Sequence, residues 1–120
     1  MMTPEDQKRK HLYLQKYIFH GLNDLNSGFD ASAISYFNEI QFEIVLARVK
    51  ELKAIGIYGI EAWKDGEFWA VDTFESYKTY PQDSHWYETA FKKFRNGDET
   101  FHYSASFYVP GNYLEYEDEV

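Results

Sequence analysis

Apolar residues near the start of the chain recur with the period of an α-helix. Four of them are spaced by four, four and three residues, which places them on one helical stripe: Leu14, Ile18, Leu22 and Leu25. Thr3 precedes Pro4 and has Asp6 three residues further on, the pattern of a capped helix start. Asn-Ser-Gly at 26–28 is a suitable end, and Gly21 is a potential earlier break. The pattern predicts a helix from Pro4 to about Leu25.

A second helical stripe begins after residue 37. Asn38 has Gln41 three residues later, which resembles a capping pair. Apolar residues then recur at spacings of three, four and three: Phe42, Val45, Val49 and Leu52. Lys50 and Lys53 fall in the last turn, where cations suit the helix dipole, and Gly56 ends the helix. Residues 29–37 fit a short helix, a strand or an ordered loop.

From residue 57 the periodicity changes to that of strands. Residues 57–63 and 67–72 are rich in strand-forming side chains, and they flank Lys64-Asp65-Gly66. Because Asp-Gly is a strong turn signal, this stretch predicts a β-hairpin. Residues 100–109 alternate apolar and polar positions and predict a third strand. Between the hairpin and the third strand we expect a helix that Ser84 caps and that ends at Asn96-Gly97. One apolar stripe runs along it: Trp86, Ala90 and Phe94.

The predicted order of elements is α, α, β, β, α, β. This order favours one α+β domain over residues 1–120, with a small, mainly antiparallel sheet of about three strands and helices on one face. We divide it into a helical half (1–56), a strand-rich acidic half (57–114) and an acidic tail (115–120). The length of 120 residues agrees with a single domain.

Charge distinguishes the two halves of the chain. Residues 1–56 hold seven acids and seven bases, whereas residues 57–120 hold thirteen acids and five bases and carry the whole net charge of −8. An anionic surface repels phosphate, so we expect neither nucleic acid nor an anionic membrane as a partner. The first ten residues are polar, and no apolar stretch approaches about 20 residues, so we expect a cytoplasmic protein. A monomer is slightly favoured.

Motifs for catalysis are absent from the sequence. The chain has no cysteine, which excludes disulfides and thiolate metal sites. It contains no Gly-x-Ser-x-Gly motif and no phosphate-binding glycine loop, and its four histidines lack metal-ligand spacing. Glu61, Glu67 and Asp72 could form a carboxylate pair, but solvated surface is the stronger interpretation. We therefore expect no enzyme, no catalytic residues, no metal and no cofactor.

Aromatic residues are the other unusual feature, because they make up 20% of the chain. Burying 24 rings in a 14.3 kDa domain is difficult, since each ring occupies about 150–250 Å². Some tyrosine and tryptophan side chains should therefore be exposed, which favours a binding surface. The competing interpretation is an aromatic core beneath an acidic, solubilising surface.

The segment Gly56-Ile57-Tyr58-Gly59-Ile60-Glu61-Ala62-Trp63-Lys64-Asp65-Gly66-Glu67-Phe68 and the helix–strand block from Trp86 to Val109 resemble bacterial immunity proteins. The relevant immunity proteins neutralise contact-dependent growth inhibition toxins or related polymorphic toxins. The resemblance covers about half of the chain and lies in size, acidity, aromatic content and layout. It implies a cytoplasmic inhibitor that binds the C-terminal domain of a cognate toxin. Such toxins are often nucleases with basic clefts, and an RNase is favoured over a DNase.

On this hypothesis the acids of the second half contact the toxin, and three aromatic residues serve as anchors. The candidate acids are Asp65, Glu67, Asp72, Glu75, Asp98, Glu99, Glu115, Glu117, Asp118 and Glu119, and the candidate anchors are Trp63, Trp69 and Tyr80. Two alternatives remain open: a small aromatic-rich module that binds a ligand or glycan, and a DNA-mimic inhibitor of a DNA-processing enzyme.

Overall fold

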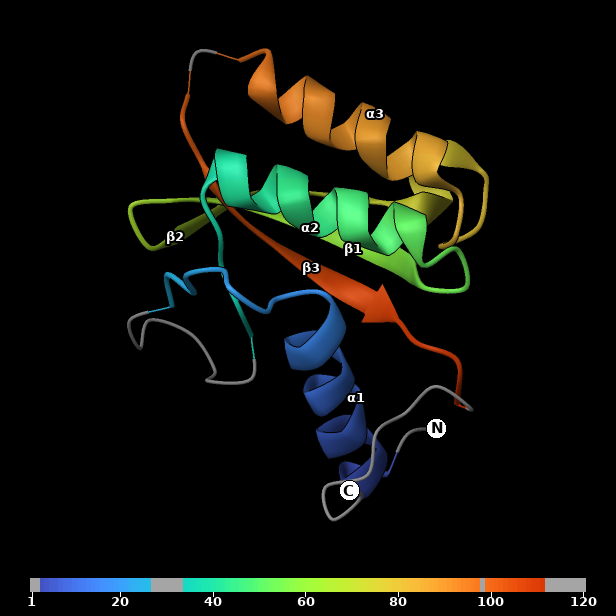
Figure 1. Ribbon diagram of the computed structural model, residues 1–120. Coiled ribbons are helices and arrows are strands. Elements are labelled where there is room, and N and C mark those ends of the chain that lie inside the picture. Colours follow the sequence, from blue (N-terminus) through green and yellow to red (C-terminus); the bar gives the residue numbers. More distant parts are fainter. Residues whose placement is uncertain (1–2, 27–33, 98, 112–120) are drawn as a thin grey trace.

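The computed structural model describes residues 3–26, 34–97 and 99–111 (Figure 1). Its helices are α1 (Pro4–Tyr17), α2 (Glu39–Glu51) and α3 (Ser84–Arg95), with a short 3₁₀ helix, η1 (Phe74–Tyr77). Its strands are β1 (Gly56–Lys64), β2 (Glu67–Thr73) and β3 (His102–Tyr108). The predicted single α+β domain and its order of elements are confirmed.

The three strands form an antiparallel sheet in the order β2-β1-β3, so that β1 is central. The β1–β2 hairpin turns through Asp65 and Gly66, which have φ angles of 54° and 79°. Two consecutive positive φ angles are what a two-residue hairpin turn of type I′ requires. Helices α2 and α3 cover one face of the sheet, whereas α1 lies beside β3, at the edge away from β2 (Figure 1).

Helix α1 is shorter than the apolar periodicity predicts. Its start is confirmed, because Thr3 and Asp6 form the expected capping box. It ends at Tyr17, and the expected continuation to Leu25 is wrong. The Arg48 guanidinium of α2 donates hydrogen bonds of 2.8 Å to the carbonyls of both Ile18 and His20. The carbonyls of Ile18 and His20, just beyond the end of α1, are thus bonded to α2, and the chain leaves the helix axis of α1 there.

The other two helix starts show one confirmed cap and one correction. Asn38 caps α2, because its side-chain oxygen accepts a hydrogen bond from the backbone N–H of Gln41 at 2.8 Å. Helix α3 is capped by Asp83 rather than by the predicted Ser84. The Asp83 carboxylate accepts the backbone N–H of His85 at 3.0 Å. Both residues are good caps, and the carboxylate one position earlier takes the role.

The core is centred on Tyr103 of β3, whose ring is sandwiched between the two covering helices. It stacks on Phe42 of α2 at 5.3 Å and meets Phe91 of α3 edge-on at 5.0 Å. Ile60 and Ala62 of β1 are fully buried in the same cluster. Many of the aromatic residues are therefore core, as one interpretation of the composition expected, although others remain exposed.

The outer side of β3 is partly covered by the segment that precedes α2. Phe37 and Tyr103 exchange two backbone hydrogen bonds, of 2.9 and 2.7 Å, as an isolated antiparallel bridge. Residues 29–37 were predicted to form a short helix, a strand or an ordered loop, and the bridge shows strand-like pairing at Phe37. Residues 29–33 lie outside the described part. No helix of the described residues is long and apolar enough to cross a membrane.

We predict that Arg48→Met destabilises the fold by about 2 kcal/mol, because it removes two charge-assisted hydrogen bonds to backbone carbonyls. Urea unfolding followed by circular dichroism measures the change. Lys50→Met is the matched control on the same helix, since Lys50 makes an exposed ion pair with Glu88. We expect it to cost less than about 1 kcal/mol. Equal losses in the two variants would contradict the proposed role of Arg48.

We also predict a loss of stability at alkaline pH. Burial, helped by the negative charge of Glu39, raises the pKa of Tyr103 from 10.0 to about 12. Because the folded state holds this proton more tightly, its contribution to stability is complete below pH 10 and is lost as the pH rises towards 12. Tyr103→Phe should remove about 2 kcal/mol of this dependence, measured by unfolding between pH 9 and 12. An unchanged dependence on pH in Tyr103→Phe would contradict the role of this phenol.

Candidate protein-binding surface

Strand β2 exposes three large apolar side chains within four residues. The exposed fractions of Phe68, Trp69 and Val71 are 51%, 55% and 50%. Single exposed apolar residues are ordinary, whereas a contiguous group on one strand indicates an interaction site. We call the surface formed by these three residues and the neighbouring Asp65, Glu67 and Glu75 the β2 surface.

A β-bulge places these side chains on both faces of β2. Trp63 pairs with Phe68 and Ala62 pairs with Ala70, which leaves Trp69 as an extra residue. The Phe68 ring lies edge-on to Trp63, at 5.8 Å, on the sheet face away from α2 and α3. Trp69 instead lies 5.6 Å from the ring of Phe101, on the helix-covered side. Bulges commonly redirect a side chain in this way.

Trp63 of β1 lies beside Phe68 on the same face of the sheet and is itself only partly exposed. Its indole Nε1–H donates to Glu61 Oε1 at 3.0 Å, and the hydroxyl of Ser104 donates to the same oxygen at 3.4 Å. The ring of Tyr36 meets the Trp63 indole edge-on at 5.3 Å. These contacts hold the indole in place beside Phe68.

Three of the predicted acids are exposed beside the apolar side chains. Asp65 and Glu67 lie at the hairpin end of β2, and Glu75 lies in η1, just after the other end. None of the three forms an ion pair within residues 3–26, 34–97 and 99–111. Their charges are therefore open to a cationic partner.

Two other predicted acids are engaged inside the molecule. Glu99 pairs with Lys64, and this bond raises the pKa of the Lys64 ammonium. Asp72 accepts a hydrogen bond of 2.8 Å from the Tyr77 hydroxyl and lies 3.6 Å from Lys93 Nζ. Burial and the bond to Asp72 raise the pKa of Tyr77. A partner would have to displace these contacts to reach either carboxylate.

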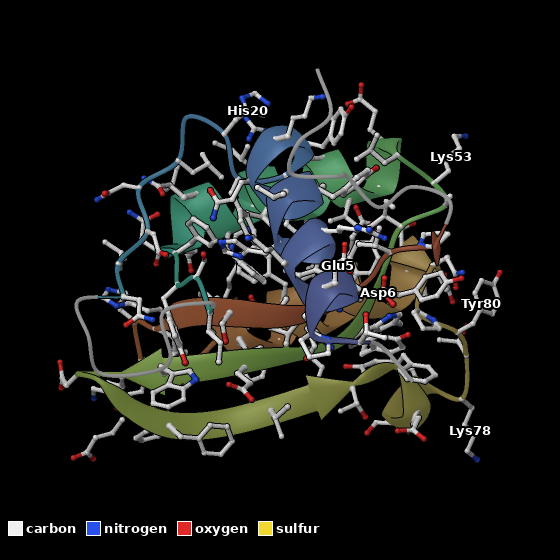
Figure 2. All side chains as sticks on the ribbon, turned by 90° about the horizontal axis from the view of Figure 1, so that it is seen from below. Glu5, Asp6, His20, Lys53, Lys78 and Tyr80 are labelled. Atoms are coloured by element: carbon white, nitrogen blue, oxygen red, sulfur yellow. The ribbon has the colours of Figure 1, made fainter. Side chains whose placement is uncertain are left out.

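The remaining predicted residues do not join the β2 surface. Tyr80 is exposed in the loop before α3, at the end of the sheet away from the Asp65–Gly66 turn (Figure 2). Asp98 and the acids of the tail lie outside the described residues: Glu115, Glu117, Asp118 and Glu119. The acids that the structure places together are thus those of the hairpin and η1.

A groove of about 530 Å³ between α2 and α3 is a feature that the sequence reasoning missed. Its lining mixes charges around a small apolar floor: Glu39, Glu43, Leu46, Ala47, Glu88, Phe91, Lys92, Arg95 and Asn96. Arg95 is already held by Glu43 at 2.7 Å and Glu39 at 3.6 Å. Ile40 and Ile44 are also exposed on α2. Their spacing of four residues was the signal in the sequence for apolar side chains on a second face of this helix.

No cluster of three or more histidine, aspartate or glutamate side chains in the described part of the chain could hold a metal ion. The β2 surface combines exposed aromatic rings with acids that form no ion pair among the described residues. Exposed aromatic side chains give a large contact area, and unpaired acids give charge selectivity. This chemistry suits binding to a cationic protein.

We predict that Phe68→Gln combined with Val71→Thr changes the free energy of unfolding by less than about 1 kcal/mol, because both side chains are half exposed. Phe42→Ala, at a buried ring of the core, should cost about 3–5 kcal/mol. Urea unfolding of the three proteins gives the comparison. A large loss in the double variant would mean that these side chains serve the fold and not a partner.

Comparisons with protein-family models, curated proteins and solved structures found no match to the chain. The β2 surface consists of Phe68, Trp69 and Val71 on an edge strand, with the exposed carboxylates of Asp65, Glu67 and Glu75 beside them.

Proposed function

We propose that this chain is an immunity protein, which binds and neutralises a basic toxin domain through the β2 surface. The observation that carries the proposal is the combination of three exposed apolar side chains with three acids that form no ion pair in the described structure. The resemblance of the hairpin to immunity proteins supports the same function, because the surface is formed by that hairpin and by η1, which follows it.

Charge explains why the partner is expected to be basic. Residues 57–120 carry the whole net charge of −8, and the acids of the β2 surface are exposed. Complementary charge accelerates association and excludes anionic competitors. A nuclease domain, preferably an RNase, presents cations where it binds phosphate, and an acidic surface can meet those cations. The toxin is therefore proposed to be a nuclease.

Geometry gives less support to the glycan-binding alternative. A sugar-stacking platform needs aromatic rings that present their faces to one site. Phe68 and Trp69 lie on opposite faces of the sheet, as their contacts with Trp63 and Phe101 show. The groove between α2 and α3 contains one aromatic ring, that of Phe91, among several ion pairs. Neither place forms an aromatic platform.

The test is a calorimetric titration with the toxin-like C-terminal domain encoded beside this gene, at two salt concentrations. We expect one-to-one binding with nanomolar affinity that weakens as salt rises. The triple variant Asp65→Lys, Glu67→Lys and Glu75→Lys should weaken binding by about 100-fold, since each reversal places like charges together. Circular dichroism should show an unchanged fold, because all three side chains are exposed.

A second triple variant controls for net charge. Glu5→Lys, Glu51→Lys and Glu88→Lys change the charge by the same amount at exposed positions on the helices. We expect this control to bind within about fivefold of the wild type, because the reversals lie away from the proposed contact. Equal weakening by both triple variants would move the interface away from β2. No binding by the wild-type protein to the folded toxin domain would overturn the immunity function.

A further inference from the structure

Among the residues that the structure describes, none pairs with the backbone of β2 on its outer side. The sheet order is β2-β1-β3, so β2 pairs only with β1. In Figure 2 β2 is the outermost ribbon of the sheet, and no other described element runs along its free side. The opposite edge differs, because Phe37 bridges to Tyr103 there. The described structure therefore covers part of one sheet edge and leaves the other open.

The hairpin turn determines which backbone groups face outward. In a two-residue hairpin the residues that flank the turn form a hydrogen-bonded pair, here Lys64 and Glu67. Because the hydrogen-bonding groups of successive residues point to alternate sides of a strand, the backbone groups of Ala62 and Ile60 in β1 also point towards β2. They face Ala70 and Asp72 there. On β2, the residues that alternate with these bonded ones direct their backbone N–H and C=O groups away from β1. These residues are Phe68, Val71 and Thr73.

We propose that the basic partner contributes an extended segment that pairs with this edge as a fourth strand. This inference rests on the proposed function and specifies how the β2 surface is used. Strand addition draws affinity from backbone hydrogen bonds and specificity from alternate side chains. The outward groups of Val71 and Thr73 would supply the bonds. The side chains of Phe68 and Val71 would supply an apolar contact on one face.

Charge selects the chemistry of the added segment. Asp65 and Glu67 lie near one end of the edge, and Glu75 lies beyond the other end. The stretch between them exposes apolar side chains. The matching segment is therefore apolar in its middle and carries lysine or arginine towards both ends.

A second copy of this chain fits the edge less well. Antiparallel pairing of β2 with itself through the outward groups of Val71 and Thr73 would place Val71 opposite Thr73 of the other copy and Asp72 opposite its Asp72. This arrangement sets like charges against each other and supplies no cation. Each copy also carries a net charge of −8, so the two would repel. A cationic partner has neither disadvantage.

Proline at position 71 tests the inference, because it removes one outward N–H without removing a bond between β1 and β2. Proline is tolerated on an edge strand when its missing N–H faces solvent. We expect Val71→Pro to weaken binding of the toxin domain by about 100-fold. The matched control Val71→Ala keeps the N–H and trims the side chain, and should weaken binding by about tenfold or less.

Amide hydrogen exchange on the wild-type protein gives a second readout that does not depend on the folding of a variant. In the free protein the amides of Val71 and Thr73 should exchange faster than those of Ala70 and Asp72. In the complex the two outward amides should become protected. Side-chain contact alone would exclude water less completely and leave them exchanging.

The outcomes separate the inference from the function on which it rests. Tight binding with equal affinity for Val71→Pro and Val71→Ala, and unprotected outward amides, would overturn strand addition and leave the immunity function standing. No binding of the toxin domain to the wild-type chain would overturn both. Sedimentation that shows a dimer of the free chain, dissociated by Val71→Pro, would assign the edge to a second copy and overturn a basic partner.

Discussion

The packing of Tyr103 between two helices is the contact on which the arrangement of the domain depends. Its ring joins Phe42 of α2 to Phe91 of α3, and its backbone pairs with β1 on one side and with Phe37 on the other. One residue thus links both covering helices, the central strand and the segment before α2. With β3 fixed beside β1 in this way, β2 is left on the outside.

Much of the fold could be predicted because its signals are local. The Asp65-Gly66 turn and the caps at Thr3 and Asn38 each act within a few residues. The end of α1 could not be predicted, since it depends on Arg48, thirty residues from Ile18. The cap of α3 could not be assigned from the sequence, because Asp83 and Ser84 are adjacent and both are suitable cap residues.

The candidate site shows the same division. Asp65 and Glu67 could be predicted to lie together because both are next to the Asp-Gly turn of the hairpin, and both are exposed in the structure. The roles of the aromatic residues were less readable. Trp63 and Trp69 differ because a bulge shifts the register between them, and such a shift leaves no clear trace in composition. That β2 forms an edge depends on β3 pairing across β1, a contact between distant parts of the chain.

The sheet order also sets the sequence of events in folding. The β1–β2 hairpin closes over two residues, whereas β3 must return past α3 to reach the other side of β1. Non-local pairing is slower than local pairing, because a longer loop must be closed first. On the ribosome the hairpin emerges before β3, so β1 waits with its second edge unpaired. The nascent chain therefore passes through a stage in which both edges of the hairpin are open, and the arrival of β3 covers one of them.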